Sequence, residues 1–268
     1  REHINDDVIR RHLEEYCKRG ITFVRDGGDA LGVSSRAKEL ASEFGIDYRT
    51  PAFAIHKNGH YGAIVGKGFD TMEEYHGLVL EAKNQGADFI KIMTTGLLDF
   101  YNHGKVTGTP LEEAEVKEMV HIAHEEGMAV MSHTNGVYGV QAAVKAGVES
   151  VEHGNYMDEE TLEQLALSDT VWVPTLVTVR NLSGCGRYEE AVLWPIIEQA
   201  ERNLKLAYRK KVKMALGSDA GAYQVLHGQG LLDEYYAVTE ILGLSDQVLS
   251  WLKAGEEKIR DTFKHPQS

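Results

Sequence analysis

Short apolar runs alternate with longer amphipathic segments along most of the chain. Each of these runs is followed by a segment with apolar residues at helical spacing, and glycine ends many of those segments. Short continuous apolar runs are typical of strands buried on both faces of a parallel sheet. The runs predicted as strands are 21–25, 48–55, 87–93, 128–132, 148–152, 170–177 and 212–217.

Several predicted helices carry specific boundary signals. Residues 71–74 and 109–112 both have the pattern of a capping box, and Pro110 adds a proline at the first helical position. A long helix is expected over 189–211. From residue 231 onward the chain is expected to be helical, with a break near 243–245.

Seven strand–helix units without a compositional break predict one domain over residues 1–268. The first predicted helix, over residues 5–19, precedes any strand. An eight-fold (β/α) barrel needs about 250 residues, so we expect an α/β (β/α)8 TIM barrel in which the first strand is missing from the sequence. A doubly wound open sheet is the alternative. It is disfavoured because no G-x-G-x-x-G follows the first strand and no G-x-x-x-x-G-K-[ST] occurs.

Composition limits the partners. A net charge of −13 argues against nucleic acid or an anionic membrane as the main partner. Only two cysteines occur, which is too few for a disulfide framework and predicts a cytoplasmic protein. No apolar run approaches the length of a membrane span, and the start of the chain has no signal-peptide character. The composition does not identify a substrate, and the expectation of a small-molecule substrate comes from the motifs described below.

Four residues with metal-binding or proton-transfer chemistry end successive predicted strands. Lys91 lies near the end of 87–93, and His133, His153 and Asp219 end or follow three later runs. Burying a charged lysine in a dry interior costs free energy unless an opposite charge lies beside it. Because the carboxyl ends of parallel strands form one face, we expect the four side chains to converge there.

The motifs around these residues resemble the amidohydrolase superfamily of metal-dependent hydrolases. S-H at 132–133, V-E-H-G at 151–154 and G-S-D-A-G at 217–221 carry the resemblance. The stretch F-I-K-I-M-T-T-G and the later N-H-G are similar to the branch of Xaa-Pro dipeptidases, arginine carboxypeptidases and imidazolonepropionase-like proteins. V-R-D-G-G and V-P-T-L add to this likeness.

The resemblance implies a binuclear metal site. Lys91 would be carboxylated by carbon dioxide to a carbamate that bridges two divalent cations, most simply zinc, with manganese as another option. His133 and His153 would hold the second metal. Asp219 would ligate the first metal, take a proton from a bridging water and pass it to the leaving nitrogen.

Two features depart from the family pattern. The H-x-H motif that holds the first metal does not occur in the 268 residues, and no flanking β-sandwich is evident. Either strand one and its H-x-H lie upstream of the sequence, which we favour because a barrel without one strand has open edges, or the metal site is reduced.

Further candidates follow the strand ends. Tyr101, His103, Asn135, Tyr156 and His227 lie in the predicted loops and are expected to meet the substrate. For each, a solvated loop residue is an equally good interpretation.

Three functions remain open on the sequence. The favoured one is metal-dependent hydrolysis of an amide or cyclic amide in a small amino-acid-derived substrate. The alternatives are a phosphotriesterase- or lactonase-like hydrolase and a non-catalytic ligand-binding barrel. The apolar positions in 231–242 are compatible with a contact between copies of the chain, so a homo-oligomer is a further possibility.

Overall fold

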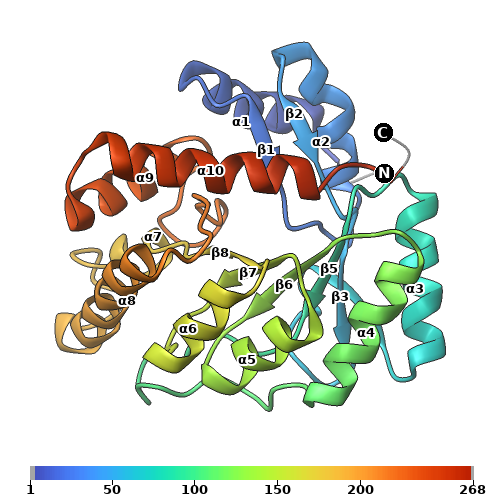
Figure 1. The fold of residues 1–268 in the computed structure, drawn as a ribbon. Helices are drawn as coiled ribbons and strands as arrows, with labels where there is room; N and C mark the ends of the chain where they lie inside the picture. The colour runs from blue at the N-terminus through green and yellow to red at the C-terminus, as the bar shows by residue number, and fades with distance from the viewer. Residues whose placement is uncertain (1–3, 267–268) are drawn as a thin grey trace.

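The computed structural model describes residues 4–266 and has the predicted alternation of strands and helices (Figure 1). In chain order the elements are α1 Asp6–Lys18, β1 Phe23–Arg25, α2 Val33–Ala41, a 3₁₀ turn Ser42–Phe44, β2 Asp47–Arg49, β3 Ala54–Lys57, β4 Gly66–Phe69, α3 Met72–Asn84, β5 Ile90–Met93, α4 Glu113–Glu125, β6 Val130–Thr134, α5 Val137–Ala146, β7 Ser150–His153, α6 Glu159–Leu167, β8 Val171–Val173, α7 Val177–Arg180, α8 Glu190–Lys210, α9 Gln229–Leu242 and α10 Asp246–Thr262.

All strand pairs in the two sheets are parallel. Six strands form one sheet in the order β4-β3-β5-β6-β7-β8, and β1 pairs with β2 in a second, two-stranded sheet. A single parallel bridge between Trp172 and Met214 continues the larger sheet beyond β8. Figure 1 shows α3 to α6 along the outer side of this sheet, with α10 crossing between the sheet and the unit formed by α1, α2, β1 and β2.

The register brings the ends of the central strands level with one another. Met93 of β5 pairs with His133 of β6, and Thr134 of β6 pairs with His153 of β7. Because parallel ladders are evenly spaced, residues at the carboxyl ends of these three strands face a common region. The predicted convergence of strand ends therefore has a direct basis in the ladder.

Three predicted strand boundaries were wrong. The run 48–55 splits into β2 and β3 around Pro51, whose ring removes a backbone donor. The glycine-rich stretch 56–68 runs into β4, which was not among the predicted strands, and a Cβ on Gly66 of β4 would lie 2.2 Å from the carbonyl oxygen of Ala54. Glycine is needed there for close approach, so the composition of β4 resembles a loop. The run 212–217 forms only the bridge at Met214.

The helix predicted to start at 109–112 begins later. The amide of Leu111 donates to Thr94 O at 2.9 Å and its side chain is buried, so this segment is held against the end of β5. α4 then starts after Glu112, whose side chain makes no capping hydrogen bond. The capping box at 71–74 is confirmed, and so are the long helix α8 and the break between α9 and α10.

The amino-terminal end of the strands is closed by the end of α10. Ile259 and Phe263 are buried among Phe89, Val173 and Ala215, and the rings of Phe263 and Phe89 meet edge to face at 5.2 Å. None of the helices between residues 4 and 266 combines the length and apolar character that a membrane span needs.

One buried hydroxyl in this core has no partner among the described residues. Tyr75 of α3 is fully buried against Phe69, and its Oη atom makes no hydrogen bond there. Burying an unsatisfied hydroxyl costs about 1–3 kcal/mol. Tyr75→Phe should therefore raise the free energy of unfolding, by roughly 1 kcal/mol, in urea denaturation.

Tyr48→Phe is the matched control, because the Tyr48 hydroxyl donates to Asp26 Oδ2 at 2.9 Å. That variant should lose stability by roughly 1–3 kcal/mol. Equal losses in both variants would contradict the assignment of Tyr75 as unsatisfied.

Candidate active site

Lys91 lies inside the fold near the carboxyl end of β5 and is 9% exposed. A Cβ placed on Gly27 would come within 2.9 Å of its Nζ atom, so the absence of a side chain at Gly27 makes room for the ammonium group. Within residues 4–266 this group forms no hydrogen bond or ion pair. A buried amine without an anion beside it is unfavourable on its own.

Two imidazoles lie next to each other beside this amine. The ring centroids of His133 and His153 are 4.8 Å apart in an edge-to-face arrangement. Burial holds the pKa of His133 well below its ordinary value, helped by the charges of His153 and Lys91. Burial and the charge of Lys91 lower the pKa of His153 to about 3. Both rings are therefore neutral at physiological pH, the form in which imidazole binds metal ions.

Each of these rings is held by a neighbour. His133 Nε2 lies 3.2 Å from Gly96 O, and His153 Nδ1 lies 2.7 Å from Thr175 Oγ1. The Tyr61 ring covers His133 at a centroid distance of 5.1 Å. Burial raises the pKa of Tyr61, with a further contribution from the charge of Asp219.

Left-handed backbone conformations occur at three strand ends that surround this spot. The φ angles are 69° at His153, 50° at Thr175 and 56° at Asp219. Such conformations cost about 1–3 kcal/mol each for non-glycine residues and cluster at functional sites. Thr175, which is β-branched, is the most unfavourable of the three.

Asp219 differs from the other three predicted ligands because it is exposed. Its charge acts on both His133 and Tyr61, which places it on the same side of the fold. In the described part of the chain, no three or more histidine, cysteine, aspartate or glutamate side chains are grouped so that they could hold a metal ion. The structure thus brings together Lys91, His133 and His153, with Asp219 at the margin.

A cavity of about 560 Å³ lies beside this group. Its walls are the loops after β3 and β5, and they contribute Gly59, His60, Tyr61, Gly96, Thr107, Gly108 and Thr109. Tyr61 and Gly96 both touch His133, so the cavity adjoins the imidazole pair. Its volume suits a small ligand.

A model of the amidohydrolase family matches residues 1–242. The chain belongs to the amidohydrolase family. Among curated relatives, ochratoxinase of Aspergillus niger is 28% identical over 212 residues, which is 77% of this chain and 40% of the relative. An uncharacterized protein of Mycobacterium tuberculosis is 26% identical over 132 residues, 47% of this chain and 35% of that protein.

Solved structures of similar fold include a Xaa-Pro dipeptidase with bound methionine, with a TM-score of 0.73 and 24% identity over 94% of this chain and 66% of that chain. Ochratoxinase of A. niger gives a TM-score of 0.77 and 20% identity over 96% of this chain and 64% of that chain. The predicted barrel fold class is thereby confirmed. This amidohydrolase chain spans less than half of the curated relatives that it matches.

Two of the predicted substrate residues of this amidohydrolase contact each other where two loops meet. The His103 and Tyr156 rings meet edge to face at 4.9 Å, and the Tyr156 hydroxyl donates to Asp99 O at 2.8 Å. Burial raises the pKa of Tyr156 to about 12. Tyr156 therefore joins the loop after β5 to the loop after β7. Tyr101, from the same loop as His103, is 74% exposed.

Asn135 and His227 are occupied by contacts within the protein. The Asn135 side chain donates to Gly96 O at 3.2 Å and accepts from the Asn155 amide at 3.1 Å, which fixes the backbone beside the histidines. His227 stacks on His12 of α1 at 4.0 Å, and its Nδ1 lies 3.0 Å from the Tyr16 hydroxyl. His227 therefore joins α1 to the loop before α9, and no contact to the imidazole pair is seen among the described residues.

Sequence reasoning missed Tyr61 and Thr175 as parts of the site. Tyr61 lies in a glycine-rich loop without a motif. Thr175 belongs to the V-P-T-L motif, which indicates the family but assigns no role to the threonine. Its contact to His153 depends on a turn conformation that residue spacing does not encode.

The neutral histidines predict a pH dependence for the metal-free protein. The unfolded chain takes up protons on these histidines as the pH falls below about 6.5, whereas the folded form does so only near or below the depressed values, about 3 for His153. Stability is therefore full above pH 6.5 and is lost as the pH falls from 6.5 toward 3. For His133 alone the slope is up to about 1.4 kcal/mol per pH unit.

Urea unfolding between pH 7 and pH 5.5 measures this loss, and NMR of the imidazole carbon-bound protons assigns it. The His133 and His153 signals should keep their neutral positions at pH 5.5. Titration of either ring near pH 6.5 would contradict the prediction.

Proposed function

We propose that this chain is a metal-dependent hydrolase that cleaves an amide or cyclic amide bond of a small, amino-acid-derived substrate. The observation that carries the proposal is the meeting of Lys91 with two neutral imidazoles at the carboxyl ends of β5, β6 and β7. Membership of the amidohydrolase family supports the reaction class.

The donor set suits divalent cations. His133 and His153 present neutral nitrogen ligands, which favour zinc over magnesium or calcium. The Lys91 ammonium group has no anion beside it among the described residues. Loss of a proton would give the neutral amine, and reaction of that amine with carbon dioxide would form an N–C bond and release a second proton, leaving a carbamate anion. That change would replace the unpaired positive charge of the buried lysine by an anion whose oxygen atoms can bind cations. A bound divalent cation would polarise the scissile carbonyl and lower the pKa of the attacking water.

Asp219 is the residue that we assign to proton transfer. Its side chain is exposed at the mouth of the site, and its charge reaches His133 and Tyr61. A carboxylate in this place can accept a proton from water and donate it to the leaving nitrogen.

The surroundings favour a small substrate. The cavity beside His133 is walled largely by glycine and threonine, so backbone groups and hydroxyls are available to a polar ligand. We assign His103 and Tyr156 to contacts with the substrate's polar end, because their rings meet where the loops after β5 and β7 come together. A dipeptide fits this description.

Lys91→Met tests the proposal. The variant should lose zinc binding and dipeptide hydrolysis together, by more than the roughly 10–100-fold that loss of a supporting partner costs. The metal-free variant should fold at least as stably as the parent, because it removes an unpaired buried charge. Metal analysis, turnover of a dipeptide panel and urea unfolding measure the three effects.

Lys57→Met is the control. Lys57 ends the neighbouring strand β3, but its ammonium group is paired with Glu115 at 2.7 Å. This variant should retain metal and turnover. Full activity of Lys91→Met, or hydrolysis of phosphotriesters and lactones without amides, would overturn the assignment.

A further inference from the structure

The His153 ring and backbone are both tied to the strand and turn that follow α6. Trp172 Nε1 of β8 donates to His153 O at 2.8 Å. His153 Nδ1 lies 2.7 Å from the hydroxyl of Thr175, in the turn directly after β8. The orientation of this imidazole is therefore set by residues 172–175.

The turn that presents Thr175 is itself held in an unfavourable conformation. The φ angle of Thr175 is 50°, which a β-branched residue rarely adopts. Such a conformation persists only where the surroundings determine it. Something in the structure must therefore fix this turn.

Glu234 of α9 supplies that fixation. Its Oε1 accepts the amide of Leu176 at 3.0 Å, and its Oε2 accepts the amide of Val177 at 3.0 Å. The two oxygens thus bind successive amides immediately after Thr175. Glu234 is connected to the His153 ring through one turn of backbone and one hydroxyl.

Packing alone does not explain why a carboxylate is buried at Glu234, because its burial costs desolvation free energy. The side chain is 0% exposed and forms no ion pair with the described residues. Burial raises its pKa to about 7, against the lowering effect of the two amides and of Arg180. An apolar residue would fill this space without the desolvation cost. We therefore attribute the presence of the carboxylate to the two backbone amides that it accepts.

We propose that Glu234 is a positioning residue for His153, acting through the Thr175 hydroxyl. The Glu234 carboxylate fixes the turn, Thr175 Oγ1 accepts the Nδ1–H of His153, and the lone pair of Nε2 is left free. A hydrogen bond at one ring nitrogen decides which nitrogen can serve as a ligand. The role in metal binding rests on the proposed function, whereas the position of the ring proton is a property of the metal-free protein.

Nitrogen-15 NMR of metal-free protein tests the position of the proton directly. In the parent, His153 should be the Nδ1–H tautomer. Thr175→Val removes only the hydroxyl and should shift the ring toward the Nε2–H tautomer, whereas Thr175→Ser should restore the parent signals. Thr170→Val is the matched control, because the buried Thr170 hydroxyl donates to Val148 O at the other end of β8.

Zinc affinity and kinetics test the role of Glu234. Glu234→Gln keeps one acceptor and places an amide N–H against the other backbone amide. It should weaken zinc binding, measured by competition with a chromophoric chelator, by roughly 10–100-fold, and should lower kcat more than it raises KM. Asp88→Asn is the control, since the Asp88 carboxylate is also buried and accepts the Thr50 amide at 2.8 Å.

The outcomes separate the two proposals. Unchanged His153 tautomer in Thr175→Val, or zinc affinity in Glu234→Gln that matches Asp88→Asn, would overturn the positioning role. A tautomer shift in Thr175→Val with rescue in Thr175→Ser would support it even if the parent hydrolysed no amide, a result that would overturn only the proposed function.

Discussion

The parallel register of β5, β6 and β7 is the constraint on which the site depends. Met93 pairs with His133 and Thr134 with His153, so the two histidines end neighbouring strands one step apart. Side chains of a strand alternate between its two faces, and Lys91 is two residues before Met93. Lys91, Met93 and His133 therefore point to one face, whereas the register alone would turn His153 to the other, and its left-handed φ of 69° redirects the chain at that point.

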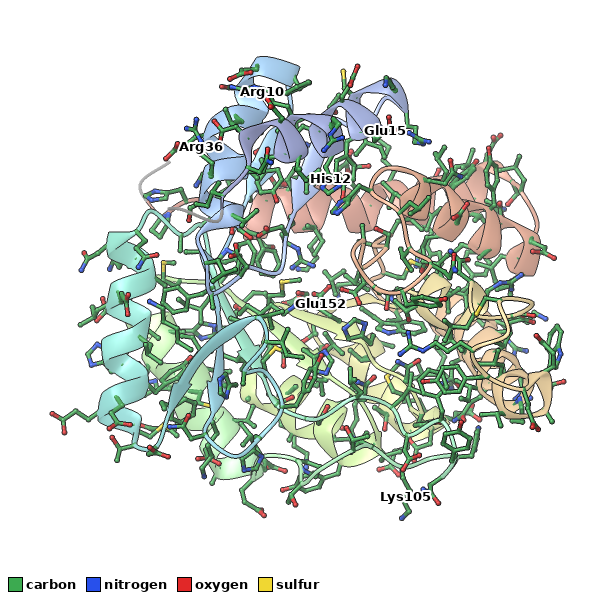
Figure 2. All side chains as sticks on the ribbon, turned by 180° about the vertical axis from the view of Figure 1, so that it is seen from behind. Arg10, His12, Glu15, Arg36, Lys105 and Glu152 are labelled. Atoms are coloured by element: carbon green, nitrogen blue, oxygen red, sulfur yellow. The ribbon has the colours of Figure 1, made fainter. Side chains whose placement is uncertain are left out.

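A buried ion pair links β1 to β7 of the main sheet. Arg25 of β1 donates to Glu152 at 2.8 Å and to Ser150 at 2.7 Å, both on β7. Its guanidinium also lies over the Phe263 ring at 4.2 Å. Figure 2 shows Glu152 near the centre of the molecule, inside the surrounding helices. No ladder joins β1 to β7, so this side-chain bridge links the two-stranded unit to the main sheet.

That bridge also affects the charges near the histidines. Glu152 directly precedes His153, yet its carboxylate is occupied by Arg25 and Ser150. It is therefore not available to neutralise Lys91. Removing one partner of a buried ion pair such as this one is strongly destabilising. In the register of β5, β6 and β7, Lys91 is level with Ser150, so the satisfied Arg25–Glu152 pair and the amine without an anion lie in adjacent layers of the interior.

The contact between α1 and the loop before α9 uses stacked neutral rings and not an ion pair. His12 lies on the side of α1 that faces the remainder of the molecule in Figure 2, and it stacks on His227. Burial lowers the pKa of both rings, to about 4 for His227. Two neutral rings can stack closely because neither repels the other by charge, so this contact belongs to the packing of α1.

The sequence was sufficient to predict what depends on local pattern. The buried strands around Lys91, His133 and His153 and the long helix α8 follow from apolar periodicity and helix boundaries. The common position of the three residues follows from the general geometry of parallel strands. β4 could not be predicted, because its glycines allow close approach to β3 and look like a loop.

The parts that escaped prediction share one physical property: they depend on pairs of residues that are far apart along the chain. Glu234 resembles any glutamate on an amphipathic helix until the amides of Leu176 and Val177 are placed against it. Thr175 resembles a strand residue until its φ angle becomes positive. Periodicity reports which face of an element is buried, but it does not report which polar atom will be desolvated with a partner.

Backbone strain at this edge of the sheet also depends on contacts between residues that are far apart along the chain. His153, Thr175 and Asp219 leave their strand or bridge segment in left-handed conformations, and each turn redirects the chain at the point where a functional side chain must be presented. The cost at His153 is offset by the hydrogen bond that Trp172 donates to its carbonyl, and the cost at Thr175 by the bonds that Glu234 accepts from the next two amides. At Asp219 the backbone carbonyl accepts the Ala222 amide at 3.0 Å, and the side chain is exposed. An exposed carboxylate beside imidazoles that are held in place suits the proton transfer that we propose, since the proton must be collected at one atom and delivered at another.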